Sequence, residues 1–198
     1  MLVSCFTSKY KNTLRAFCLT MAMTGTAIAY SGLAAVAQEL TPEQISALHT
    51  RISDFNRAMH SSDYNTIASV TPPKMIAFIA GQAGMDQKTL RDGMISQIKA
   101  AMEKVTLESY SMDLAAAEYK SLSDNSIFAL IPTETIMDIA EMGRIQQRSD
   151  TLALLDEGQW YLVRIADTAQ ASILRQVYPQ FADVEFSRGS MNMLKQAE

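Results

Sequence analysis

The chain has only two cysteines, Cys5 and Cys18, and both lie close to its amino end. From residue 19 onward no thiol is present, which excludes a cysteine nucleophile, a thiol redox pair and a cysteine-ligated zinc site in that part. A Gly-rich phosphate loop, a G-x-S-x-G elbow and an H-E-x-x-H motif are also missing. The enzyme classes that short motifs reveal most readily are therefore not indicated.

Histidine is equally scarce, since His49 and His60 are the only two. On one helix they would lie about 16 Å apart, which is too far for a single metal ion. Methionine is common, but after residue 37 the only close pair, Met191 and Met193, is too little for a copper site. We therefore predict no metal site and no cofactor.

Acidic residues are absent from the first 37 positions, which instead have the pattern of an export signal. Three basic residues precede an apolar run at 16–36, which ends in the small-x-small sequence Ala35-Val36-Ala37. This pattern predicts a secretory signal peptide at 1–37, cleaved near Ala37, and a periplasmic or secreted protein. An N-terminal membrane anchor is the alternative, because about 20 apolar residues can span a bilayer.

Basic residues are in deficit once that segment is removed. Of the 17 Lys and Arg residues 14 remain, against 21 acidic ones, which gives a net charge of −7. A protein with this negative net charge is not expected to attract the phosphate backbone of a nucleic acid. Nucleic acid is therefore not an expected partner.

Apolar residues at helical spacing predict helices in the half of the chain that follows the signal. Thr41-Pro42-Glu43-Gln44 has the residues of a capped helix start, and Asp86 can cap a later helix. The expected segments are a helix from Thr41 to about Met59, a short inward-facing segment at 63–70, a helix from Thr71 to about Gly81, and a helix from Asp86 to about Lys104.

A strand pattern replaces the helical one after residue 104. Two shorter strands are expected at 105–112 and 114–121, followed by three long strands between Ser126 and Asp167. Two tight turns, Glu141-Met142-Gly143 and Asp156-Glu157-Gly158, join the long strands, each with glycine third, where a three-residue loop needs a positive φ. Pro132 lies inside the first long strand and predicts a bulge or bend.

Turns of three residues define a register for these strands. The first turn then pairs Ile139 with Ile145, and the second pairs Asp150 with Arg164. One sheet face carries apolar side chains and then turns polar: Leu152, Leu154, Trp160 and Leu162, followed by Glu134, Asp138, Arg148, Asp150 and Arg164. The last two strands are apolar on their other face as well, so we expect cover on both faces, by helices and by a second copy of the chain. A slip of one residue would exchange the faces.

The carboxyl end predicts one more helix and a tail. Thr168 is a possible cap for a helix through Val177, which Pro179 would stop. The tail from Phe181 is expected to wrap the body or to fray. The predicted organisation is a signal at 1–37, one α+β domain at 38–167, and a helix and tail at 168–198.

Three short stretches give the chain a resemblance to the NTF2-like (SnoaL-like, cystatin-like cone) superfamily. They are Asp63-Tyr64 after the first helix, Thr71-Pro72-Pro73, and Glu157–Val163 with its Trp-Tyr dipeptide. The resemblance covers about 41–167 and implies N-terminal helices packed on a strongly curved antiparallel sheet. It also implies a pocket in many members, dimers through the outer sheet face, and, in the enzymes, an acid-base Asp or His in the pocket.

Two groups of residues are candidates for a pocket. The polar sheet residues Glu134, Arg148, Asp150 and Arg164 could hold a polar ligand or tune one carboxylate as a base. The simpler interpretation, which we favour, is a cross-strand ion pair of Asp150 and Arg164 contributing about 0.2–1 kcal/mol. His60 beside Tyr64 could act as a base, but a histidine at a helix end is more often solvated and suits the helix dipole.

The apolar sheet residues Leu152, Leu154, Trp160 and Leu162 are candidates for the core or for a dimer interface. We therefore expect an exported NTF2-like protein, homodimeric and non-catalytic, that binds a small apolar or polar ligand or acts as an accessory module. The alternative is a small-molecule lyase or isomerase of the SnoaL type with a pocket carboxylate or histidine as base. A third hypothesis is a subunit docked on an envelope protein partner through its sheet.

Overall fold

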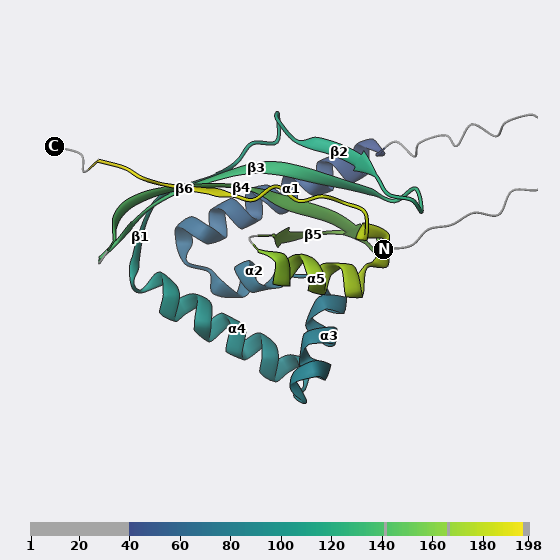
Figure 1. Ribbon diagram of the computed structural model, residues 1–198, viewed down its shortest axis with the longest axis horizontal. Coiled ribbons are helices and arrows are strands. Elements are labelled where there is room, and N and C mark those ends of the chain that lie inside the picture. The colour runs from purple at the N-terminus through teal and green to yellow at the C-terminus, as the bar shows by residue number, and fades with distance from the viewer. Residues whose placement is uncertain (1–39, 141, 166, 196–198) are drawn as a thin grey trace, which may run out of the picture. The chain divides into compact units, whose positions relative to one another are not determined.

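The computed structural model of the chain describes residues 40–140, 142–165 and 167–195 (Figure 1). Its helices are α1 (Pro42–Ser61), α2 (Tyr64–Ser69), α3 (Pro73–Ala83), α4 (Gln87–Met102), α5 (Thr168–Val177) and the 3-10 turn η1 (Pro179–Phe181). Its strands are β1 (Val105–Met112), β2 (Glu118–Ser121), β3 (Ile127–Ile139), β4 (Gly143–Asp156), β5 (Gln159–Arg164) and β6 (Ser190–Met193). The predicted α+β fold, with helices on a strongly curled antiparallel sheet, is confirmed. The predicted signal at 1–37 lies outside the described residues.

The helix starts follow the capping signals in the sequence. The Thr41 N–H donates to Gln44 Oε1 (2.9 Å), and the Gln44 N–H donates to Thr41 Oγ1 (3.2 Å), which completes a capping box. Asp86 caps α4 as expected. The last helix is capped by Asp167 rather than by Thr168, because the aspartate one residue earlier supplies the acceptor oxygen.

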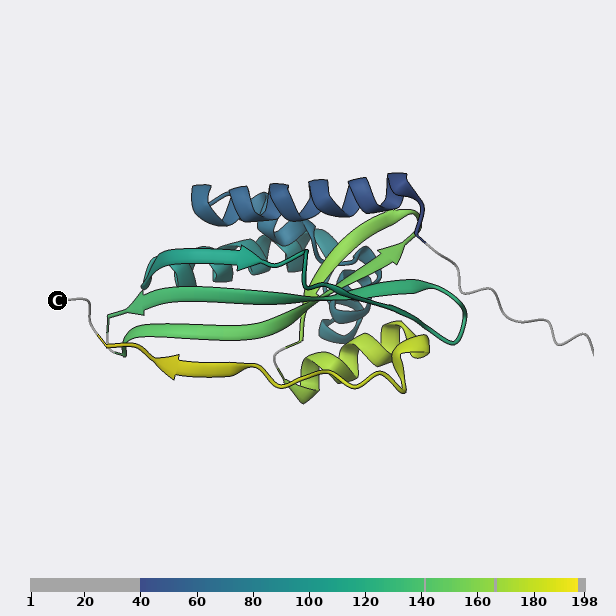
Figure 2. The same ribbon diagram turned by 90° about the horizontal axis from the view of Figure 1, so that it is seen from above.

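The sheet is built on β3 and β4, which pair from Ile139–Gly143 to Phe128–Leu154 without a bulge. β1 and β2 pair with successive parts of the outer side of β3, and β6 and β5 pair with successive parts of the outer side of β4 (Figure 2). Pro132 lies where the partner of β3 changes from β2 to β1. The tail thus supplies a strand, β6, that the sequence pattern did not predict.

The first turn brings the strands together two residues away from the expected register. Ile139 pairs with Gly143, and Met137, rather than Ile139, pairs with Ile145. A shift of two residues keeps every side chain on its expected face, because side chains alternate with period two. Glu134, Arg148 and Asp150 therefore remain on one face.

The second turn is shorter than predicted, and this overturns the expected face assignment. Glu157 (φ 50°) and Gly158 (φ 78°) alone form a two-residue loop, the conformation of a type I′ hairpin turn. Arg164 consequently pairs with Thr151, so the predicted Asp150–Arg164 pair is wrong. The shift of one residue moves all of β5 to the opposite face relative to β4.

Both faces of the curled sheet are covered by helices of the same chain. Trp160 and Leu162 pack with Leu48 and Ile52 of α1 on the inner face. Leu152 and Leu154 pack on the outer face with strand residues and with residues of α3, α5 and η1. The strands β3 and β5 supply Phe128 and Val163, the helices supply Met75, Leu174 and Phe181, and Tyr178 lies between the last two helices. The prediction that both faces are buried is confirmed.

The four residues proposed for a core or dimer face are core residues divided between these two clusters. Leu152, Leu154, Trp160 and Leu162 are each 5% exposed or less within the single chain, and the Trp160 indole N–H donates to Gln44 O at 2.8 Å. They are not accessible to a second copy. Within the described residues no helix is long and apolar enough to cross a membrane.

Candidate functional site

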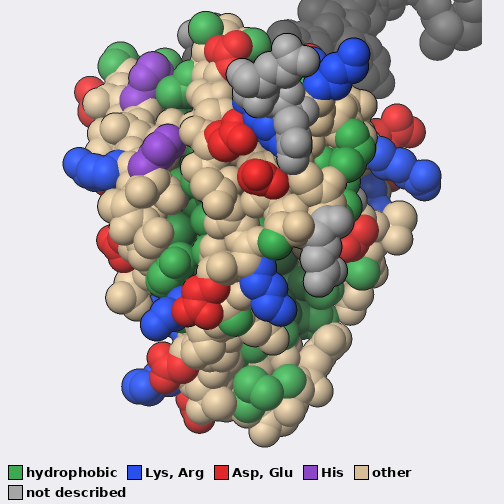
Figure 3. Space-filling model, turned by 90° about the vertical axis from the view of Figure 1, so that its left-hand side faces the viewer, with side chains coloured by type: hydrophobic (Ala, Val, Ile, Leu, Met, Phe, Trp, Pro, Cys, Tyr) green, Lys and Arg blue, Asp and Glu red, His purple; other side chains and the backbone are tan. Residues whose placement is uncertain are grey.

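Partly buried apolar side chains lie on α4 and on the inner face of the sheet, at the end of the described chain that carries the β3–β4 hairpin. The side of the molecule with the β3–β4 hairpin faces the viewer in Figure 3, where hydrophobic side chains form the floor of a hollow. α4 lies against α2, α3 and the start of β1. Within the described residues, α4 does not pack extensively against β3 or β4.

α4 is a capped helix of 16 residues in which no side chain is buried. Its apolar stripe is only partly covered: Leu90, Met94, Ile95, Ile98 and Met102. An amphipathic helix normally buries such a stripe against the core. The apolar stripe of α4 is therefore only half-buried by the part of the chain that the structure describes.

The sheet presents matching apolar residues on its inner face. Ala129 and Ile131 of β3 face α1, and uninterrupted pairing with β4 continues the alternation to Met137 and Ile139. Leu107 of β1 pairs with Met137 and is also partly exposed. We call α4 and these three sheet residues (Leu107, Met137 and Ile139) the inner groove.

Charged side chains on the solvent side of α4 are mainly basic. Lys88 is paired with Asp92 at 2.6 Å. Arg91, Lys99 and Lys104 have no ion-pair partner among the residues that the structure describes. Lys104 follows the helix beside Glu103, so residues 86–104 carry four basic and three acidic side chains, a net charge of +1.

Three of the six predicted pocket residues do meet, in a shallow polar groove of about 470 Å³ on the outer face. Glu134 Oε2 accepts hydrogen bonds from Arg148 Nε (2.7 Å) and Gln146 Nε2 (2.9 Å). Asp150 accepts from the Ser187 hydroxyl, and Ser187–Ser190 of the tail forms one wall. Each carboxylate already has a donor, so neither is placed as a free base.

Arg164 lies on the other face from this groove, toward Tyr110. The hydroxyl oxygens of Thr133 and Thr151 lie 2.7 Å apart there, in the interior. Burial raises the pKa of Tyr110, and the hydrogen bond to Thr151 and the charge of Arg164 offset only part of that rise. Tyr110 is thus a neutral phenol at any physiological pH.

His60 and Tyr64 lie at the junction of α1 and α2, away from both grooves. His60 is exposed in the last turn of α1, and its Nδ1 lies 2.8 Å from Asn56 O. This is the position in which a charged histidine suits the helix dipole. The six predicted pocket residues therefore occupy three separate places.

A cluster that sequence reasoning missed lies in a cavity of about 450 Å³ beneath α5 and η1. Asp156 accepts hydrogen bonds from Tyr178 Oη (2.8 Å) and Lys74 Nζ (2.6 Å), and its side chain is only 13% exposed. Burial and the hydrogen bond to Asp156 raise the pKa of Tyr178. Asp156 ends β4, Lys74 belongs to α3 and Tyr178 lies between α5 and η1, so no local motif links the three residues.

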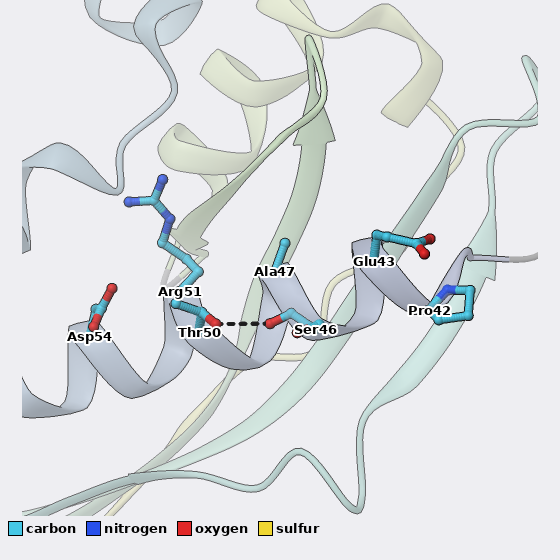
Figure 4. A pocket seen from close by; sticks show the side chains of 7 residues that line it. All are labelled: Pro42, Glu43, Ser46, Ala47, Thr50, Arg51 and Asp54. Carbon is cyan, nitrogen blue, oxygen red and sulfur yellow. Dashed lines mark hydrogen bonds between the residues drawn. The ribbon is translucent and has the colours of Figure 1, made fainter.

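A surface depression of about 690 Å³ follows one side of α1 (Figure 4). All of its lining side chains come from this single helix, and Thr50 Oγ1 donates to Ser46 O at 3.0 Å within it. Arg51 and Asp54 lie at one end and Pro42 at the other. A wall made of one helix gives no converging groups, so we assign no chemistry to it.

Within 40–140, 142–165 and 167–195, no group of three or more His, Cys, Asp or Glu side chains could hold a metal ion. Comparisons with known families, with curated proteins and with solved structures found no match for this chain. The geometry of the inner groove and of the two polar clusters is therefore the basis for a functional proposal.

Proposed function

We propose that the chain is an exported, non-catalytic binding protein of the NTF2-like type that holds a single-chain anionic lipid in the inner groove. One observation carries the proposal: α4 is a capped amphipathic helix none of whose apolar residues is buried. A hydrocarbon chain lying between α4 and Met137 would remove these side chains from water. Each Å² of apolar surface so covered contributes roughly 25 cal/mol.

The composition of the groove favours a flexible apolar ligand. Met94, Met102 and Met137 have unbranched, polarizable side chains that adapt to irregular shapes. The half-buried residues of the groove include no polar side chain that would hydrogen-bond to polar groups of a ligand. Arg91, Lys99 and Lys104 on the rim supply positive charge for an acidic head group.

A lyase or isomerase is less well supported. Such an enzyme needs a general base within reach of a bound substrate. Glu134, Asp150 and Asp156 each accept hydrogen bonds from neighbouring side chains. These bonds account for the carboxylates as structural groups.

The proposal is tested with the fluorescent probe N-phenyl-1-naphthylamine and its displacement by myristate. The wild-type protein should enhance the probe's fluorescence, and myristate should reverse the effect. Ile98→Asp should weaken both affinities at least tenfold, because it places a negative charge in the apolar stripe beside the ligand. Ile45→Asp, at a 39% exposed position on α1, is the matched control and should bind like the wild type.

Failure of the wild-type protein to bind either molecule would refute the lipid proposal, as would equal losses in the two variants. Export is tested separately, by sequencing the amino end of the protein recovered from the periplasm. Gln38 should be its first residue, and an intact amino end on a membrane-bound protein would contradict the proposed cleavage.

A further inference from the structure

β6 ends the sheet with an edge that is unusually open. All four of its residues are exposed, and two of them, Met191 (55%) and Met193 (64%), are the most exposed large hydrophobic residues of the described chain. β6 pairs with β4 on one side, and among the described residues no strand pairs with its other side. Ser190–Met193 contains no charge and no proline, so of the features that usually protect an edge it has only its short length of four residues.

The backbone groups that β6 leaves unpaired can be identified from its register. The Leu194 N–H donates to Arg144 O at 2.8 Å, so Leu194 and Arg144 form a hydrogen-bonded pair. Such pairs alternate along an antiparallel ladder, and Asn192 opposite Gln146 is therefore the next one. The N–H and C=O groups of Met191 and Met193 consequently point away from β4.

We propose that this edge pairs with β6 of a second copy of the chain, antiparallel and about a two-fold axis through Asn192. Met191 of each copy then exchanges both backbone hydrogen bonds with Met193 of the other, and the two Asn192 residues face each other in a non-hydrogen-bonded pair. The four methionine side chains meet on the inner face. This surface does not depend on the lipid proposal.

Self-complementarity is the reason to choose a second copy over another protein. A two-fold axis brings the same surface of the two copies together. In β6 the backbone N–H and C=O groups of Met191 and Met193, the two residues that must pair, already point away from β4. The opposite edge of the sheet, β1, lies against α1 and has a register shift between Leu107 and Ser109. Pairing at one edge closes the assembly as a dimer and does not build a fibre.

The register is tested by cross-linking in a background in which Cys5 and Cys18 are serine. Two Cα atoms in a non-hydrogen-bonded pair lie about 4.5 Å apart, within the range of a disulfide. Asn192→Cys should therefore form an intermolecular disulfide under mild oxidation. Met191→Cys is the matched control and should not, because the two copies of that residue would lie more than ~7 Å apart, beyond disulfide range.

Association itself is measured by light scattering on a sizing column. The wild type should elute with twice the chain mass. Met191→Pro removes an N–H that points away from β4, a position where an edge strand tolerates proline, and should be monomeric with an unchanged circular dichroism spectrum. A wild-type monomer at high micromolar concentration, a dimer that Asn192→Cys does not cross-link, or a dimer that survives Met191→Pro would each overturn the proposal.

Discussion

Replacing Tyr178 by phenylalanine should destabilise the fold by about 1.5–3 kcal/mol, the range for a hydrogen bond to a charged group. Tyr178 is 4% exposed, and the side chain of Asp156, which accepts its hydrogen bond, is 13% exposed. Phenylalanine keeps the ring that packs edge-on against Phe181. The loss therefore measures the hydroxyl contact rather than a cavity.

The second donor to Asp156 provides an internal comparison. The Lys74 side chain is 47% exposed, so solvent screens its pairing, and Lys74→Gln should cost only about 0.2–1 kcal/mol. Tyr119→Phe, at a position that is 44% exposed, should change stability little. Urea unfolding followed by the fluorescence of Trp160, the only tryptophan, gives all three values. A loss below about 0.5 kcal/mol for Tyr178→Phe, outside the range expected for such a bond, would refute this reasoning.

The same contact predicts the behaviour at high pH. The folded-state pKa of Tyr178 is raised above its usual value of 10.0, first by burial and then by the hydrogen bond to Asp156. The stability that this rise represents is fully present below pH 10 and is lost as the pH increases through the folded-state pKa. Unfolding measured between pH 9 and pH 11, a window of roughly one unit on each side of an unperturbed tyrosine, should show this decline, and Tyr178→Phe should reduce it.

Two further predictions concern glycine and the cap of α4. Gly158→Ala should destabilise the fold by about 1–2 kcal/mol, because alanine is strained at φ 78°. Gly93→Ala, in open space on α4, should instead stabilise the fold by about 0.5–1 kcal/mol. Urea unfolding measures both changes, and equal effects would contradict the turn assignment. Asp86→Ala removes the acceptor of the Thr89 N–H and should speed amide hydrogen exchange in the first turn of α4, while Asp86→Asn should not, because asparagine is an equally good cap. Exchange that is unaffected by the alanine substitution would show that the cap does not hold α4.

Much of the architecture could be predicted because it depends on local chemistry. The capping box at Thr41, the cap at Asp86 and the alternation along β3 and β4 all act within a few residues of their own position. The burial of both sheet faces was predictable for the same reason. Apolar residues on both sides of β4 and β5 require cover whatever provides it.

The candidate site was only partly predictable, and the misplacement of Arg164 has a single origin. Glu134, Arg148 and Asp150 were placed together correctly because they share one face of adjacent strands. Arg164 was misplaced because a turn of two residues replaced one of three, and that single residue moved it across the sheet.

The amino-acid sequence alone determined the order of the elements, the helix starts and the need to bury both sheet faces. Each of these depends on local backbone geometry or on the burial of apolar side chains. The contact of Tyr178 with Asp156, the pairing of β6 with β4 and the exposure of α4 depended on packing between distant segments. Partners far apart in the chain are selected by how whole elements fit together. Side chains of similar polarity satisfy the local pattern equally well in either register.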